Sequence, residues 1–133
     1  ILNASRFRYR SVLKGTLRRV KQKKVGKTNE ILGYSDLEFK NHIESMFTGD
    51  MSWYVKYSFS VDHIIPLVAF KENTPINIIN SLKNLKPMLQ SDNMDKFISI
   101  DYNYIDLYIE YYDYIIESYK IQIDNYIKKL NTF

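Results

Sequence analysis

The chain has 133 residues and a formal net charge of +4 at pH 7, and 45% of its residues are hydrophobic. This length predicts one domain, 1–133, with a buried core, and the apolar content excludes a wholly disordered chain. Cysteine is absent, which excludes disulfides and thiolate zinc sites, so no structural zinc is expected. No apolar run reaches membrane-spanning length and no signal-peptide pattern opens the chain, so we expect a cytoplasmic, intracellular protein without a membrane partner.

Charge is strongly segregated along the chain. Segment 1–27 holds ten basic residues and no acidic one, whereas the remaining nine basic and fifteen acidic residues have a net charge of −6. This distribution is typical of a protein that binds a polyanion, and a solvated basic face is the alternative. The expected nucleic-acid-binding residues are Arg6, Arg8, Arg10, Lys14, Arg18, Arg19, Lys21, Lys23 and Lys24.

The same basic segment has a helical pattern, and we predict a helix over residues 4–24. Its expected apolar positions are Phe7, Val12, Leu13, Leu17 and Val20. Each Lys or Arg that meets a phosphate releases counterions, so binding by this helix should depend steeply on salt and little on base sequence.

A second helix is predicted to begin after Ser35. Ser35 and Glu38 have the spacing of a capping box, and Tyr34 with Phe39 could form a hydrophobic staple around it. The helix is expected to stop near Gly49. His42 lies on this helix, where we expect a partly buried structural histidine or a surface histidine rather than a catalytic one.

Two strands and two helices are predicted in the middle of the chain. Alternation of apolar and polar side chains over 57–62 predicts a half-buried strand with Asp62 on its open face. A short helix is expected over 74–82, and a short or edge strand over 85–89, because the latter contains a proline. A further helix is expected over 91–97.

Apolar side chains recur every three or four residues over 101–130, which predicts a long amphipathic helix, continuous or broken. Six acidic residues against three lysines make it a poor surface for DNA. We expect it to pack either on the rest of the domain or on a second copy, so a homodimer through this helix is an open alternative. The predicted fold class is α+β and mostly helical.

Asp62 and His63 stand side by side at the end of the first predicted strand, and Asn84, Asn93 and Lys96 follow. A histidine with its ordinary pKa of about 6.5 can deprotonate water at neutral pH, which accelerates hydrolysis roughly 10²–10⁴-fold. The carboxylate of Asp62 and the amide oxygen of Asn93 are hard donors that suit Mg²⁺ or Mn²⁺. The set is suited to phosphodiester hydrolysis, although each residue by itself is more often an ordinary surface, turn or cap residue.

The ordered pattern is VDHIIPL at 61–67, NLKPM at 84–88 and DNMDK at 92–96. It resembles the HNH endonuclease family, whose ββα-metal motif has Asp-His, then Asn, then Asn or His. The resemblance covers roughly residues 31–97, with the ββα-metal core at 57–97.

The resemblance implies a role for each motif residue. Asp62 and Asn93 would be metal ligands, and His63 would be the general base. Asn84 would be structural, bonding across the loop to orient His63, and Lys96 would approach the phosphate. The third motif position is Asn rather than His here, and this neutral oxygen donor favours Mg²⁺ over zinc or nickel.

The sequence therefore predicts a metal-dependent DNA endonuclease with no small-molecule cofactor. Phage packaging, restriction and homing enzymes all use this motif, and a bacterial or phage-infected host would fit the composition. Two alternatives remain, namely a DNA-binding module of the same fold that does not cut, and a toxin-type nuclease controlled by a protein inhibitor.

Overall fold

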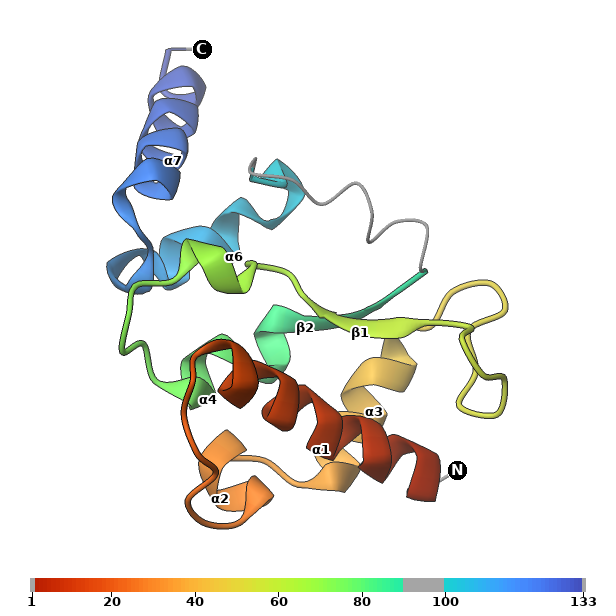
Figure 1. The fold of residues 1–133 in the computed structure, drawn as a ribbon. Coiled ribbons are helices and arrows are strands. Elements are labelled where there is room, and N and C mark those ends of the chain that lie inside the picture. Colours follow the sequence, from red (N-terminus) through yellow and green to blue (C-terminus); the bar gives the residue numbers. More distant parts are fainter. Residues whose placement is uncertain (1, 90–99, 133) are drawn as a thin grey trace.

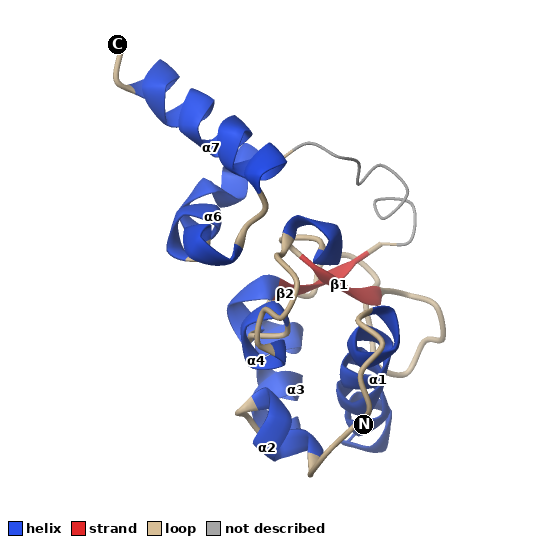
Figure 2. Ribbon diagram, turned by 60° about the vertical axis from the view of Figure 1, so that its left-hand side comes forward, coloured by secondary structure: helices blue, strands red, loops and turns tan. Residues whose placement is uncertain are grey.

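This computed structural model describes residues 2–89 and 100–132 and has an α+β fold (Figure 1, Figure 2). Helices α1 (Leu2–Arg19), α2 (Thr28–Leu32) and α3 (Asp36–Ser45) precede the strands β1 (Ser60–His63) and β2 (Leu85–Met88). The connection between the strands contains η1 (Leu67–Ala69), α4 (Ile76–Ile79) and η2 (Leu82–Asn84). The C-terminal part contains η3 (Tyr102–Tyr104), α6 (Ile105–Glu110), η4 (Tyr112–Tyr114) and α7 (Glu117–Leu130).

The two strands form an antiparallel pair in which Asp62 lies opposite Lys86 and His63 lies opposite Leu85. β2 confirms the second predicted strand. β1 is shorter than predicted at its N-terminal end, because Tyr57 has a left-handed backbone (φ 66°) that an extended strand cannot contain. The helix predicted over 74–82 is also shorter, since α4 covers residues 76–79. The helix predicted over 91–97, with Asn93 and Lys96, lies outside the described residues.

The inner face of α1 packs on α3 (Figure 1), and its buried residues share one core with Leu85 of β2. The buried residues of this N-terminal core are Tyr9, Leu13, Leu17, Leu32, Tyr34, Phe39, Ile43, Phe59 and Leu85. Of the apolar positions named in the predicted helix, Phe7 does not join this core, since it is 70% exposed. Tyr9 takes the buried position instead, and its hydroxyl donates to the carbonyl oxygen of Tyr34 at 2.6 Å. α1 also ends five residues earlier than predicted, and Lys21 follows it with φ 58°.

The N-terminus of α3 confirms the predicted capping box. The Ser35 hydroxyl accepts from the Glu38 backbone N–H at 3.1 Å, and the Glu38 carboxylate accepts from the Ser35 N–H at 3.0 Å. α3 ends at Ser45, before the predicted stop at Gly49. The His42 Nε2 lies 2.9 Å from the carbonyl oxygen of Leu85, to which it must donate, so this histidine ties α3 to β2.

The C-terminal segment is divided rather than one long helix. Ile115 is extended (φ −96°, ψ 141°) and forms a β-bridge with Phe70, which separates α6 from α7. The buried residues of this second core are Ile65, Ala69, Phe70, Ile79, Ile100, Tyr108, Tyr111, Ile115, Tyr119 and Ile123. The segment therefore packs on the strand connection of its own chain, while the far end of α7 extends away from the body (Figure 1). In the described part of the chain, no helix has the length and apolar character needed to cross a bilayer.

Candidate active site

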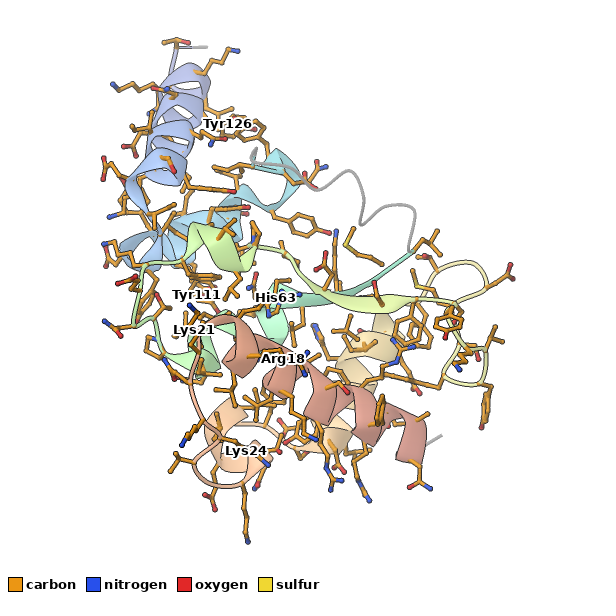
Figure 3. The ribbon with its side chains drawn as sticks, in the orientation of Figure 1. Arg18, Lys21, Lys24, His63, Tyr111 and Tyr126 are labelled. Carbon is orange, nitrogen blue, oxygen red and sulfur yellow. The ribbon has the colours of Figure 1, made fainter. Side chains whose placement is uncertain are left out.

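A hollow of about 180 Å³ lies between α1 and β1, and we call it the α1–β1 hollow. It is lined by Arg8, Ser11, Val12, Gly15, Thr16, Arg19, Val61, Asp62 and His63. The Asp-His pair and the basic helix are more than forty residues apart in sequence, yet they meet here. His63 lies beside the C-terminal half of α1, the half that also carries Arg18 (Figure 3).

His63 is held by a residue that the sequence pattern did not single out. Its side chain is 8% exposed, and its Nε2 lies 2.6 Å from the Oδ1 atom of Asn80, which directly follows α4. The same amide oxygen accepts from the Thr16 hydroxyl at 2.8 Å. Asn80 therefore links the strand connection to both α1 and the histidine.

This contact determines which nitrogen of His63 carries the proton. An amide oxygen can only accept, so Nε2 must donate, and in the neutral ring Nδ1 is then the nitrogen that can take a proton. Asn80 is fully buried, and its Nδ2 group has no hydrogen-bond partner within residues 2–89 and 100–132. Leaving a buried donor unpaired costs about 1–3 kcal/mol, which offsets part of the stability that the two bonds to the amide oxygen contribute.

Asn84 is a structural residue that bonds across the loop, as the resemblance implied, and its bonds go to the backbone around His63. Its fully buried side chain accepts from the Ile65 N–H at 2.6 Å and donates to the carbonyl oxygens of Ile65, at 3.2 Å, and Ile79, at 2.8 Å. Its backbone carbonyl accepts from the Ile64 N–H at 2.7 Å. Asn84 thus fixes the backbone that follows His63 rather than contacting the ring.

The guanidinium of Arg8 is held in place at one end of the hollow. It lies 4.5 Å from the centre of the Phe59 ring and donates to the Phe59 carbonyl oxygen at 2.9 Å. Burial lowers the pKa of Arg8 from its ordinary value, but an arginine remains charged at neutral pH. Arg19 is exposed and lines the hollow further along α1. Two cations therefore flank the position of Asp62 and His63.

Gly15 lies in the middle of α1 and faces the same hollow. A Cβ atom added there would meet no atom within 4 Å. Alanine would stabilise the helix by about 1 kcal/mol relative to glycine, so helix stability does not explain why this position is a glycine. The missing side chain leaves room for a group that approaches the helix backbone closely.

A hard divalent cation fits the part of the site that is described. Asp62 supplies a half-buried carboxylate at the hollow, and Mg²⁺ is commonly bound by one or two carboxylates while it keeps several waters. The second expected ligand, Asn93, lies outside the described residues. Among residues 2–89 and 100–132, no group of three His, Cys, Asp or Glu side chains could hold a metal ion. The expected site has one carboxylate and one amide, so it is not of this type.

The basic residues predicted to bind nucleic acid divide into groups. Arg8 and Arg19 line the α1–β1 hollow. Arg6 donates to the Asp36 carboxylate at 2.6 Å, so its charge is largely engaged within the protein. Arg18, Lys21 and Lys23 are exposed near the end of α1 and in the loop that follows. A second pocket contains Arg6, Arg10, Lys14 and Lys24.

Sequence reasoning missed Asn80, Thr16 and Gly15. Asn80 follows two isoleucines in the connection between the strands, and its position alone gave no signal of a contact with His63. Thr16 and Gly15 lie inside a helix that was interpreted from its charges.

Comparison of the chain with protein-family models, with curated proteins and with solved structures finds no match. The chemistry of the site therefore rests on its own residues.

Proposed function

We propose that this protein is a metal-dependent DNA endonuclease of the HNH type that hydrolyses phosphodiester bonds at the α1–β1 hollow. One observation carries the proposal: Asp62 and His63 lie in a hollow whose opposite wall is the basic helix, with Arg8 and Arg19 beside them. A phosphate placed there would meet two cations, a candidate base and a metal-binding carboxylate together.

The proposed mechanism assigns a separate task to each group. His63 takes a proton from water at Nδ1, the water oxygen bonds to phosphorus, and the bond from phosphorus to the 3′ oxygen breaks. Arg8 and Arg19 offset the negative charge of the phosphate. When bound by Asp62 and Asn93, Mg²⁺ would stabilise the charge that develops on the phosphate and the leaving oxygen. Asn80 and Asn84 keep the ring and the following backbone in place.

The test is cleavage of supercoiled plasmid with Mg²⁺, with Mn²⁺ and with EDTA. We expect nicked or linear product that requires metal, and a loss of at least about 10²-fold in His63→Ala. His42→Gln is the matched control, because His42 is the other histidine and its glutamine variant keeps a donor for Leu85. Equal cleavage by wild type and His63→Ala would overturn the assignment of His63. Nicked product indicates sites that act singly, and linear product indicates sites that act in pairs.

A second candidate function has its own supporting observation. His63 is 8% exposed and its Nε2 is hydrogen-bonded inside the protein, which is also what a structural histidine does. A DNA-binding module of the same fold that does not cut would therefore retain DNA and fail to cleave it with either metal.

The homodimer through the C-terminal helix stays a prediction, and sedimentation at micromolar concentration would test it.

A further inference from the structure

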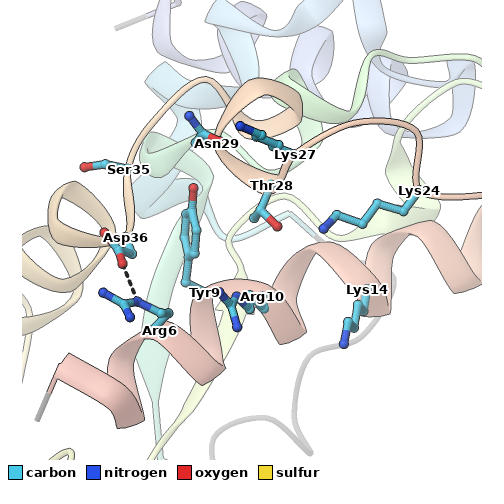
Figure 4. Close-up of a pocket in the computed structure, with 10 residues that line it drawn as sticks. All are labelled: Arg6, Tyr9, Arg10, Lys14, Lys24, Lys27, Thr28, Asn29, Ser35 and Asp36. Atoms are coloured by element: carbon cyan, nitrogen blue, oxygen red, sulfur yellow. Dashed lines mark hydrogen bonds and ion pairs between the residues drawn. The ribbon is translucent and has the colours of Figure 1, made fainter.

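A second basic pocket lies on the other flank of α1, and we call it the α1–α2 pocket (Figure 4). Its volume is about 650 Å³. Arg6, Arg10 and Lys14 follow one another at four-residue intervals, so they share one stripe of the helix. Lys24 and Lys27 come from the loop before α2, and Figure 4 shows Lys24 reaching from that loop across the space above α1.

The charges in this pocket are not balanced by the protein. Asp36 is the one carboxylate among the lining residues, and Arg6 already donates to it at 2.6 Å. Within the described part of the chain, no hydrogen bond or ion pair engages the side chains of Arg10, Lys14, Lys24 and Lys27, all of which are exposed. Four neighbouring cations repel one another, so an arrangement that gathers them in a concavity is suited to an anion.

The lining favours phosphate over a nucleobase. Tyr9 is the one aromatic residue of the lining, and it is buried with its hydroxyl bonded to Tyr34. It therefore offers no open ring face on which a base could stack. The accessible charged groups are Lys and Arg heads, which contact phosphates without reading base identity, and the smaller polar side chains of Asn29 and Ser35 lie beside them.

We propose that the α1–α2 pocket binds the phosphate backbone of a nucleic acid at a position separate from the α1–β1 hollow. Arg18 lies one turn beyond Lys14, on the exposed ridge of α1 between the two sites. A strand bound in both sites would cross this ridge. The choice of ligand rests on the proposed nuclease function, but the pocket itself contributes affinity and no chemistry.

The test is binding of a labelled duplex of about 20 base pairs in EDTA, where no cleavage can occur, over a series of salt concentrations. We expect Arg10→Glu/Lys14→Glu to weaken binding at low salt by at least about tenfold, and to reduce the slope of log affinity against log salt by about 2, which corresponds to two lost phosphate contacts. Arg10→Gln/Lys14→Gln should show the same change in slope with a smaller loss. The matched control is Lys128→Glu/Lys129→Glu, which makes the same change in net charge at the end of α7.

An unchanged slope in both pocket variants, or an equal loss in the control, would overturn the pocket as a binding site. Tripolyphosphate provides a second arm, and it should bind wild type far more weakly than the duplex because it offers few phosphates. If tripolyphosphate binds as tightly as the duplex, and the pocket variants lose this affinity, the ligand of the pocket is a small polyphosphate and the nucleic-acid proposal is overturned. Plasmid cleavage does not enter this test, so a wild type that never cuts would defeat the nuclease proposal and leave the pocket result intact.

Discussion

The side chains of His63 and Asn80 are joined by a hydrogen bond of 2.6 Å between Nε2 and Oδ1. Asn80 lies in the connection between the strands and is fully buried, and its amide oxygen also accepts from Thr16 on α1. The histidine ring is therefore held by the strand connection, at an atom that also bonds α1. Its orientation depends on the packing of α1 against this connection.

Removing the amide of Asn80 should destabilise the protein. In Asn80→Ala the His63 Nε2–H and the Thr16 hydroxyl lose a buried acceptor, so we expect the free energy of unfolding to fall by about 1–3 kcal/mol. Urea denaturation measures the change. Asn77→Ala, at an exposed position of α4, is the control and should stay within about 0.5 kcal/mol of wild type. Similar values for the two variants would contradict the role of the amide.

The side chain of Asn84 should matter more for stability than that of Asn80. Asn84→Ala removes three hydrogen bonds to the buried backbone at Ile65 and Ile79, and we expect a loss of about 3 kcal/mol or more. The exposed Asn103 provides a control variant, Asn103→Ala, that should unfold like wild type. A loss below about 1 kcal/mol in Asn84→Ala would show that water replaces these bonds without cost.

Substitutions of Gly15 should separate stability from function. Gly15→Ala should raise the free energy of unfolding by about 0.5–1 kcal/mol, since a Cβ meets no atom within 4 Å and alanine favours the helix. The same Cβ enters the hollow, so plasmid cleavage should fall, and it should fall further in Gly15→Leu. Thermal unfolding and cleavage are measured on the same samples. Full cleavage by both variants would rule out a close approach of the substrate to α1 at this point.

The ion pair between Arg6 and Asp36 should make stability sensitive to acid. The hydrogen bond from Arg6 lowers the pKa of Asp36 in the folded protein. The pair therefore contributes stability above the unfolded pKa of about 3.9, and this contribution disappears as the pH falls through the lower folded pKa. Both side chains are partly exposed, so we expect no more than about 1 kcal/mol.

The measurement for this pair is the free energy of unfolding at pH 7, 5 and 3 for wild type, Arg6→Gln and Asp36→Asn. Wild type should lose more stability than either variant over the acid range, and the differences between the three proteins should become smaller toward pH 3. Parallel pH curves for wild type and Arg6→Gln would mean that the pair contributes nothing measurable.

Local patterns predicted several elements correctly. The capping box of Ser35 and Glu38 was predictable because both bonds join residues three apart. The second strand followed from residues 85–88, and the basic helix followed from the spacing in α1. The helical periodicity of the C-terminal segment left open whether its long helix is continuous or broken, and the pairing of Ile115 with Phe70 breaks it. That pairing joins two residues that are far apart in the sequence, so no local sequence pattern predicts it.

The sequence by itself determined the segregation of charge into α1, the adjacency of Asp62 and His63, and the absence of thiol ligands, because these are properties of composition and order. The tertiary structure decided which residue holds the histidine and which cations stay available for a ligand. The Thr16–Asn80 contact spans 64 residues. Such contacts depend on how α1 docks against the strand connection, and docking follows from the whole buried surface rather than from any short motif.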